Sequence, residues 1–443
     1  MARFVLVGAC LLALGAEALA NGRPPQTSTI NFRPGNDSEI AAGTSFGLLI
    51  SKDGGATWRW MCEDALPYGG MYDPDYEIMT SGTLFATTFD GLKVNRDGCV
   101  FASTVLAPPE PELKFFSVVA RASNNTFYAA SADPTDGNVY KSMDEGMSFM
   151  PLPAPGQLND WWQSMEVAPS DPNRIYLSGY RFVQTPDAGT KKVFLLFTST
   201  TAGASWTPLP LTDFVAMSNS TIEIAGVSRT NPLHVFARVT LEDNAIADGI
   251  YESTNGGQNW TKILTKMGSI AFVMRANGDL VAGTQTQGVF RRAMGQTTWT
   301  ELTTAPHINC LVENAAGEVW ACTQNYGIPQ IPMDGYGIMK SSDLVTWTPV
   351  LKYQDIFEPV ACPMDTLQYM KCDRPAATGA PLGWCGLCDQ LGCDPKRSCV
   401  AAVDGPPPKK EGCCETGGSS GGGALAVGAM VGIVLRRRRK KRR

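Results

Sequence analysis

Two short segments hold the residue types best suited to chemistry on a ligand, an acidic run and a tryptophan pair. Asp73 and Asp75 lie in the run Tyr72-Asp73-Pro74-Asp75-Tyr76-Glu77. Paired carboxylates across a cleft hydrolyse glycosidic bonds, and carboxylates together with backbone carbonyls bind Ca²⁺, although the spacing here is not that of an EF-hand. The alternative, which we favour, is a solvated turn between two structural units.

The adjacent Trp161 and Trp162 could provide an aromatic surface on which a sugar ring stacks. They precede an expected strand at residues 164–167. Since adjacent side chains in a strand point in opposite directions, at most one of the two can be buried on a given face. We therefore weigh an exposed, ligand-binding tryptophan against simple packing in the core.

The composition excludes several other kinds of chemistry. Only two of the 443 residues are histidine, which rules out a metal site built from several His. Ser, Cys and His form no recognisable nucleophile motif, and no glycine-rich phosphate loop follows a strand. We therefore predict no catalytic residue, no metal and no cofactor. Nucleic acid is not expected as a partner, because subtracting the eight positive charges of residues 436–443 from the net charge of −5 leaves −13 on the body of the chain.

The N-terminus is typical of a sorting signal rather than of a folded element. Residues 1–20 have a positive start at Arg3, an apolar stretch and a small-residue cleavage site at Ala18-Leu19-Ala20, which together predict a signal peptide. The alternative is a buried terminal strand or helix. Export would place the protein in an oxidising compartment, where cysteines form disulfides.

The C-terminus also predicts a sorting signal. Residues 413–443 combine Cys413 and Cys414, a Gly/Ser run, the short apolar stretch 424–435 and the basic cluster. This order predicts a membrane segment whose basic end stays in the cytoplasm, and a solvated or nucleic-acid-binding arm is the alternative. The combination resembles the MYXO-CTERM sorting signal of myxobacterial surface proteins. That resemblance implies processing near the cysteines by a dedicated sorting protease and retention at the surface of a Gram-negative cell.

An internal repeat organises the middle of the chain. Residues 51–58 have the form S-x-D-x-G-x-T-W, and closing aromatic residues recur at positions 58, 101, 149, 206, 260, 299 and 347. Their mean spacing of about 48 residues suits one four-stranded propeller blade per copy. The four best copies contribute the motif residues Ser51, Asp53, Gly55, Thr57, Trp58, Ser142, Asp144, Gly146, Phe149, Ser199, Gly203, Trp206, Ser253, Asn255, Gly257 and Trp260.

Each copy has the chemistry of a tight hairpin turn. Asp or Asn can accept hydrogen bonds from N–H groups of its own turn, Gly permits positive φ, and Trp can fill the gap between neighbouring sheets. The motif resembles the Asp-box, or BNR, repeat of sialidases, sortilin-type receptors and bacterial surface propellers. The catalytic set of sialidases does not carry over, because Phe32-Arg33-Pro34 lacks the Ile of their F-R-I-P motif and seven copies exceed their six blades.

The sequence therefore predicts an all-β fold, a seven-bladed β-propeller of four-stranded blades. Six or eight blades are the alternatives, because three copies of the repeat are degraded. We place a signal peptide at residues 1–20, the propeller at 21–355, a Cys-rich stalk at 356–412 and the sorting segment at 413–443. Residues 29–32 are expected to add a strand to the last blade and so close the ring.

Ten of the thirteen cysteines remain once those of the signal peptide and the anchor are set aside. We expect one disulfide between Cys62 and Cys99, about one blade apart, and another across the hairpin that Cys310 and Cys322 flank. The other six predict a small disulfide-stapled module with open connectivity, and a Cys-only zinc site using a C-x-x-C pair is the alternative. These six are Cys362, Cys372, Cys385, Cys388, Cys393 and Cys399.

The leading functional hypothesis is a surface-displayed propeller that binds a protein or glycan ligand through one face of its ring, without catalysis of its own. The runner-up is an extracellular glycoside hydrolase that acts through paired carboxylates. A structural coat component is the third hypothesis. The residues offered for ligand contact are the four already named, Trp161, Trp162, Asp73 and Asp75.

Overall fold

The chain divides into two compact units, residues 1–400 and 401–443, and every described residue lies in the first. The predicted signal peptide and sorting segment lie outside the described residues. Within the described part, no helix is long and apolar enough to cross a membrane. The computed structural model describes residues 24–66, 73–106, 114–132, 136–185, 189–214, 220–240, 248–328, 331–373 and 383–393.

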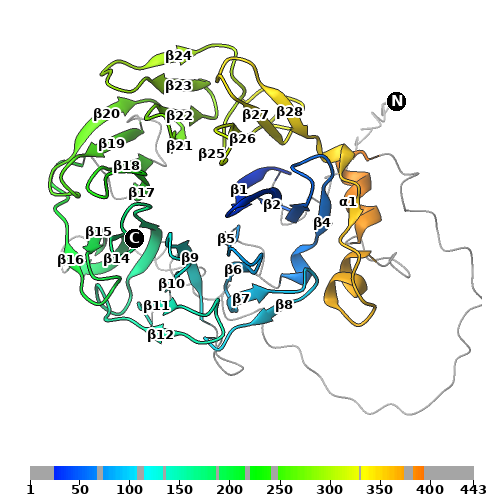
Figure 1. Ribbon diagram of the computed structural model, residues 1–443, viewed down its shortest axis with the longest axis horizontal. Coiled ribbons are helices and arrows are strands. Elements are labelled where there is room, and N and C mark those ends of the chain that lie inside the picture. Colours follow the sequence, from blue (N-terminus) through cyan, green and yellow to red (C-terminus); the bar gives the residue numbers. More distant parts are fainter. Residues whose placement is uncertain are drawn as a thin grey trace, which may run out of the picture. The chain divides into compact units, whose positions relative to one another are not determined.

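Seven β-sheets are arranged as the blades of a ring (Figure 1). Six blades have four strands, and the first blade has a fifth at its outer edge. The predicted all-β, seven-bladed propeller with four-stranded blades is therefore confirmed. The strands of a blade follow one another along the chain, so that each blade begins near the centre of the ring and ends at its rim (Figure 1).

The first four blades cover residues 27–208. The first contains β1 (Thr27–Arg33), β2 (Asn36–Thr44), β3 (Gly47–Ser51) and β4 (Arg59–Met61). The second contains β5 (Tyr76–Ile78), β6 (Leu84–Thr88), β7 (Gly91–Asn95) and β8 (Phe101–Ser103). The third contains β9 (Phe116–Arg121), β10 (Phe127–Ser131), β11 (Val139–Ser142) and β12 (Met150–Pro151). The fourth contains β13 (Trp161–Val167), β14 (Ile175–Thr185), β15 (Gly189–Ser199) and β16 (Thr207–Pro208).

Three further blades and a C-terminal segment follow. The fifth blade contains β17 (Thr221–Val227), β18 (Val235–Thr240), β19 (Gly249–Ser253) and β20 (Thr261–Thr265). The sixth contains β21 (Ser269–Met274), β22 (Leu280–Thr284), β23 (Val289–Arg292) and β24 (Thr300–Leu302). The seventh contains β25 (Cys310–Glu313), β26 (Val319–Cys322), β27 (Ile338–Ser341) and β28 (Thr348–Leu351). The short helices η2 (Glu63–Ala65), η3 (Tyr353–Asp355), η4 (Gln368–Asp373) and α1 (Trp384–Leu391) and the strand β29 (Glu358–Pro359) complete the described elements.

The second strand of each blade packs between neighbouring sheets and forms the core. Strands β6, β10 and β22 are buried at every position. Both faces of such a strand contact other sheets, which explains their nearly continuous runs of apolar and small residues. Between the second and third blades, the rings of Phe85 and Phe127 stack with their centroids 4.0 Å apart.

The repeated motif forms the turn between the third and fourth strands of a blade. In the first blade, Asp53 accepts hydrogen bonds from the Thr57 N–H at 2.9 Å and from the Thr57 hydroxyl at 2.6 Å. The Ser51 hydroxyl accepts the Gly55 N–H at 2.9 Å, and Gly55 has a φ of +90°, which glycine adopts without strain. Trp58 is buried and donates its indole N–H to the Gly55 carbonyl.

Three other copies repeat this bonding pattern in the third, fourth and fifth blades. In each, a Ser hydroxyl accepts the Gly N–H four residues later, and the residue in the Asp position accepts the N–H of the residue four positions on. The fourth blade uses a Thr hydroxyl in place of the carboxylate. The groups concerned are Ser142, Asp144, Gly146 and Ser148; Ser199, Thr201, Gly203 and Ser205; and Ser253, Asn255, Gly257 and Asn259.

The expectation that residues 29–32 add a strand to the last blade and close the ring was wrong. Strand β1 is the innermost strand of the first blade and pairs with β2, while the seventh blade has four strands of its own. The physical reason is the two-residue link Pro34-Gly35, in which Gly35 has a φ of +76°. So short a link forms a hairpin and leaves β1 no reach to another blade.

The ring is closed instead by the residues that follow the last blade. Strand β29 pairs in parallel with β4 at the rim of the first blade. The N–H groups of Phe357 and Val360 donate to the carbonyls of Trp58 and Trp60 at 2.9 and 2.8 Å. The chain thus returns from the seventh blade and becomes the outermost strand of the first.

Two disulfides fix this returning segment, and they correct the pairing expected for the propeller. Cys62 is bonded to Cys372 and Cys99 to Cys362, so the predicted Cys62–Cys99 disulfide does not form. Cys62 follows the outer strand of its blade whereas Cys99 precedes the outer strand of the next, so these cysteines lie at opposite ends of equivalent strands. The prediction of a separate module stapled by six cysteines was also wrong, because Cys362 and Cys372 bond to cysteines of the propeller.

The other predicted disulfide joins neighbouring strands of the seventh blade. Cys310 of β25 and Cys322 of β26 are register partners and are bonded to each other, as expected for the hairpin they flank. Farther along the chain, α1 packs beside the first blade, where the rings of Trp60 and Trp384 have centroids 5.8 Å apart. Cys385 in this helix is also disulfide-bonded.

The turn carboxylates should contribute a pH-dependent part of the stability. The hydroxyl and N–H of Ser148 bond to Asp144 and lower the pKa of its carboxyl to about 2. A lowered acid pKa stabilises the fold above the unfolded pKa of about 4, and this contribution is lost as the pH falls through 2. We expect Asp144→Ala to reduce the free energy of unfolding by about 1 kcal/mol at pH 7 and by clearly less at pH 2, where the carboxyl is partly protonated, measured by denaturant unfolding.

The matching control for that variant is Thr201→Ala in the fourth blade. Its hydroxyl occupies the same position in the turn but does not ionise. Its effect should therefore be the same at pH 7 and at the acid end of the series. An equal pH dependence in both variants would contradict the assigned role of the carboxylate.

The two disulfides that join the returning segment to the propeller should stabilise the fold more than the hairpin disulfide. They close loops with sequence separations of 310 and 263 residues, against 12 for Cys310–Cys322. Longer closed loops restrict the unfolded chain more strongly. Replacing the four cysteines of the long loops by Ala should lower the free energy of unfolding by at least about 5 kcal/mol, and Cys310→Ala/Cys322→Ala by roughly 3 kcal/mol. A denaturation midpoint of the four-cysteine variant that equals or exceeds that of Cys310→Ala/Cys322→Ala would contradict this.

Candidate functional site

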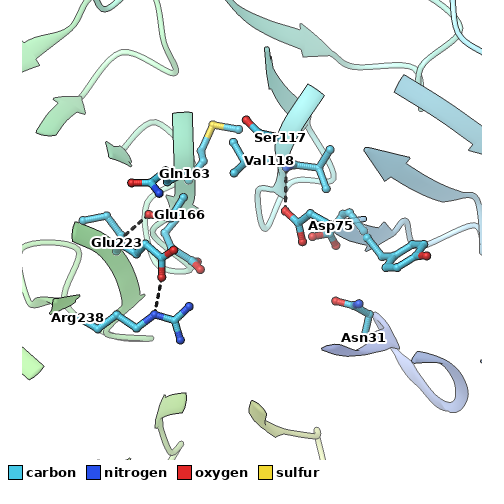
Figure 2. Close-up of a pocket in the computed structure, with 14 residues that line it drawn as sticks. Asn31, Asp75, Ser117, Val118, Gln163, Glu166, Glu223 and Arg238 are labelled. Atoms are coloured by element: carbon cyan, nitrogen blue, oxygen red, sulfur yellow. Dashed lines mark hydrogen bonds and ion pairs between the residues drawn. The ribbon is translucent and has the colours of Figure 1, made fainter. Parts of the chain in front are cut away.

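A polar cavity of about 330 Å³ lies where the innermost strands of the first five blades converge (Figure 2). Figure 2 shows Glu166, Glu223 and Arg238 on one side of it and Asp75 and Asn31 on the other. The cavity therefore brings together side chains from blades that are far apart in the sequence. Its lining residues are Asn31, Asp75, Tyr76, Glu77, Ser117, Val118, Val119, Gln163, Ser164, Met165, Glu166, Glu223, Ile224 and Arg238.

Asp75 belongs to this cavity rather than to a solvated turn, so that interpretation of the acidic run was wrong for Asp75. It immediately precedes β5, and its backbone N–H donates to the Thr87 hydroxyl at 2.8 Å. Its carboxylate accepts the N–H of Val119 from the next blade at 3.0 Å. Asp73 is half-buried, is not one of the lining residues, and is therefore not paired with Asp75 across the cavity.

Three carboxylic acids in the cavity have raised pKa values. Burial, together with the charges of Glu77 and Asp75, raises the pKa of Glu166 to about 8. Burial also raises the pKa of Glu77 to about 7, although Arg121, whose Nε lies 3.1 Å from the Glu77 Oε1, opposes the shift. For Asp75, burial raises the pKa to about 6 against the effect of its Val119 hydrogen bond. Near neutral pH, Glu166 therefore holds a proton.

The cavity also contains an ion pair and several unsatisfied polar atoms. The Nε of Arg238 lies 2.5 Å from a carboxylate oxygen of Glu223. Asn31 Nδ2, Ser117 Oγ and Gln163 Oε1 are buried without a hydrogen-bond partner in the described part of the chain. Buried polar atoms are normally satisfied, so these three are available to hydroxyl, amide or water groups that enter the cavity.

The tryptophan pair divides between the core and the surface. Trp162 is buried and donates its indole N–H to the Gly137 carbonyl at 2.9 Å. Trp161 is only half-buried, and its ring lies parallel to that of Tyr180 with an interplanar angle of 7° and centroids 6.4 Å apart. Of the two, Trp161 is the one that can contact a ligand.

Trp161 begins a row of aromatic side chains on a projecting hairpin. Strands β14 and β15 are each 11 residues long, but β13 pairs with β14 only as far as Tyr180. Residues 181–185 pair only with β15 and extend about 17 Å beyond the blade. Phe182, whose exposed fraction is 55%, packs edge-on against Tyr180 with centroids 5.3 Å apart.

A lysine on the neighbouring strand completes this surface. Lys192 Nζ lies 4.3 Å from the Tyr180 ring centroid and 5.6 Å from that of Phe194, and it donates to the Ser220 carbonyl at 2.7 Å. We call the surface formed by Trp161, Tyr180, Phe182, Lys192 and Phe194 the aromatic ribbon. Rings combined with one fixed cation favour a ligand that has both apolar faces and polar groups.

Metal binding receives no geometric support in the described residues, where no group of three or more His, Cys, Asp or Glu side chains is arranged to hold an ion. The Ca²⁺ alternative for Asp73 and Asp75 accordingly has no ligand set there. The sequence pointed to Asp75 but missed Glu166, Glu223 and Arg238. A charged residue within a short β run, as Glu166 is in β13, was the available signal.

No protein-family model matches the chain, and a search of curated proteins finds no match. Many solved structures match it. The extracellular domain described as a hybrid two-component system from B. thetaiotaomicron has a TM-score of 0.49 and 16% identity over 74% of this chain and 39% of that one. The chain thus spans about two fifths of the length of that structure.

Two other solved structures are lower in TM-score. The GH74 xyloglucanase from Xanthomonas campestris has a TM-score of 0.35 and 14% identity over 78% of this chain and 67% of that one. YCF48 from Cyanidioschyzon merolae has a TM-score of 0.34 and 15% identity over 54% of this chain and 73% of that one. At these identities and TM-scores the likeness says nothing about what this chain does, and its propeller fold is established by its own sheet topology.

The raised pKa values in the cavity predict a stability that falls as the pH rises. A carboxyl whose folded pKa exceeds its unfolded value of about 4 stabilises the fold fully below pH 4, and this contribution is lost as the pH rises through the folded pKa. For Glu166 that point is about pH 8. We expect Glu166→Gln to be more stable than the unmodified protein at pH 9, by at least about 1 kcal/mol, and similar at pH 5, measured by denaturant unfolding.

The control for this pH experiment is Glu223→Gln. It leaves Arg238 without its ion-pair partner and should lower stability at both pH values. A Glu166→Gln variant that is less stable than the unmodified protein at pH 9 would show that ionisation of Glu166 does not destabilise the fold.

Proposed function

We propose that this protein is an exported propeller that binds a glycan at the aromatic ribbon, without catalysis of its own. The observation that carries the proposal is the continuous aromatic surface from Trp161 through Tyr180 to Phe182, on a hairpin that extends beyond its blade. Three disulfides are consistent with an oxidising compartment. Retention at the cell surface is part of the proposal and rests on the sequence of residues 413–443.

Glycan chemistry suits this surface better than protein chemistry. The apolar faces of sugar rings stack on aromatic rings, and the sugar hydroxyls need donors and acceptors beside them. Lys192 supplies such donors, and its position over Tyr180 is fixed by the bond to the Ser220 carbonyl. More than half of the Phe182 side chain is exposed, so its ring is available for contact.

The cavity lies close enough to the aromatic ribbon to share one ligand. Trp161 and Gln163 belong to the same strand, two residues apart, which corresponds to about 7 Å along β13. Gln163 Oε1 is one of the unsatisfied polar atoms of the cavity. A glycan that stacks on Trp161 could therefore extend a sugar hydroxyl toward Gln163.

A glycoside hydrolase is the second candidate, and one observation favours it. Glu166 is protonated near neutral pH, while Glu223 in the same cavity is paired with Arg238. Glycoside hydrolysis uses two carboxyl groups, one of which acts as a protonated acid. Binding alone remains our proposal, because the aromatic ribbon lies outside the cavity and needs no chemistry.

Replacing the exposed aromatic residues should weaken glycan binding. We expect Trp161→Ala and Phe182→Ala each to raise the dissociation constant at least about tenfold, since each removes a stacking face. The measurement is a screen of the purified secreted protein on an array of polysaccharides, followed by calorimetric titration with the best binder. Phe357→Ala is the matched control. Phe357 is also exposed, by 43%, but it lies beside the first blade in contact with Arg59 and does not belong to the aromatic ribbon.

The same screen separates the alternatives. Unchanged binding in Trp161→Ala and Phe182→Ala would overturn the ribbon as the glycan site. If no glycan binds, and the protein instead captures a protein ligand that neither variant binds, the ligand of the ribbon is a protein and not a glycan. Turnover of a polysaccharide that Glu166→Gln abolishes would establish the hydrolase.

A further inference from the structure

The C-terminal end of α1 brings two cysteine side chains together. The helix ends at Gly392, whose φ is +67°. The Cys393 N–H donates to the Cys388 carbonyl at 2.9 Å, and the Gly392 N–H donates to the Asp389 carbonyl at 3.3 Å. This pair of bonds is the Schellman motif, in which the side chains at the positions of Cys388 and Cys393 normally make an apolar contact.

Here both of those positions carry sulfur. Cys388 and Cys393 hold thiols in the structure, and the two side chains are within hydrogen-bond contact of each other. Cys388 is 3% exposed and belongs to the core cluster of the first blade, and Cys393 packs against that cluster. The backbone bonds of the motif fix both Cα positions, so the contact does not depend on a flexible loop.

The remainder of the described cysteines are oxidised. Six form the three disulfides of the propeller and its returning segment, and Cys385, one turn before Cys388, is disulfide-bonded as well. A compartment that oxidises these pairs also oxidises two thiols held in contact, because the proximity of the second thiol favours closure. We propose that Cys388 and Cys393 form a further disulfide in the exported protein.

The chemistry is thiol–disulfide exchange with a disulfide-bearing oxidant. The Cys393 thiolate attacks one sulfur of the donor, which releases a donor thiol and leaves a mixed disulfide. The Cys388 thiolate then attacks the Cys393 sulfur and displaces the second donor thiol. The two protein thiols lose two protons and two electrons, and the donor disulfide gains them.

Oxidation should precede docking of the helix on the first blade. Burial raises the pKa of the Cys393 thiol, and contact with Cys388 adds to that effect. Little thiolate is therefore present once α1 is packed, and the thiolate is the reactive species. The finished bond would hold the end of α1 where the Tyr326 hydroxyl donates to the Leu391 carbonyl at 2.6 Å.

Peptide mapping tests this bond directly. The full-length protein is exported to an oxidising compartment, denatured in the presence of an alkylating reagent without reduction, and cleaved before aspartate. Cleavage before Asp389 separates Cys393 from the peptide that contains Cys385 and Cys388, so only a disulfide to one of those two cysteines can keep the two peptides joined. We expect the joined pair, which separates on reduction, and no alkylation at either cysteine. Alkylation of both cysteines, or a bond from either one to another cysteine, would overturn the proposal.

Substitution of one cysteine checks the assignment against disulfide exchange during the analysis. In Cys388→Ser, Cys393 should become fully alkylated, because its partner is gone. The same readout on Cys310→Ser, where Cys322 should become alkylated, is the matched control for a disulfide that the structure contains. A Cys393 that stays unmodified in Cys388→Ser would show that it pairs elsewhere.

Discussion

Closure of the ring between the first and the seventh blade is the constraint on which this structure depends. Every other pair of neighbouring blades is linked by the chain itself, but these two meet only through side chains and the returning segment. Strand β1 lies against β25 and β26, and the rings of Phe32 and Trp320 meet edge-on with centroids 5.1 Å apart. A Cβ atom at Gly55 would lie 2.8 Å from Val350 and 3.0 Å from Trp320. The first copy of the repeated turn must therefore contain glycine both for its own φ and for this contact.

The central cavity follows from the same closure. When seven inner strands converge, polar side chains that would be solvated on an open sheet face each other across a narrow space. Asp75, Glu77 and Glu166 come from two different blades; Asp75 raises the pKa of Glu77, and both of these carboxylates raise the pKa of Glu166. Such a cluster costs stability when it is ionised. The fold tolerates it because Arg121 and Arg238 from the neighbouring strands pair with Glu77 and Glu223.

The sequence predicted what is local and missed what depends on closure. The blade count came from a turn whose hydrogen bonds span four residues, so that Ser51 and Asp53 carry the signal within one motif. The Cys310–Cys322 disulfide was predictable for the same reason, since it joins two adjacent strands. Cys62 and Cys372 are 310 residues apart, and no local pattern relates them. Glu166 and Glu223 were missed because only the ring brings their strands together.

The two faces of the ring are under different constraints, which explains where a binding surface can arise. Antiparallel strands place the third-to-fourth turns on one face and the second-to-third connections on the other. The former span only five to seven residues in all seven blades, because the repeated motif and its aromatic plug fix their length. The latter range from the two residues 45–46 to the fifteen residues 323–337. Extension of β14 and β15 alters neither the turn motif nor the core, so the aromatic ribbon could lengthen without disturbing closure of the ring.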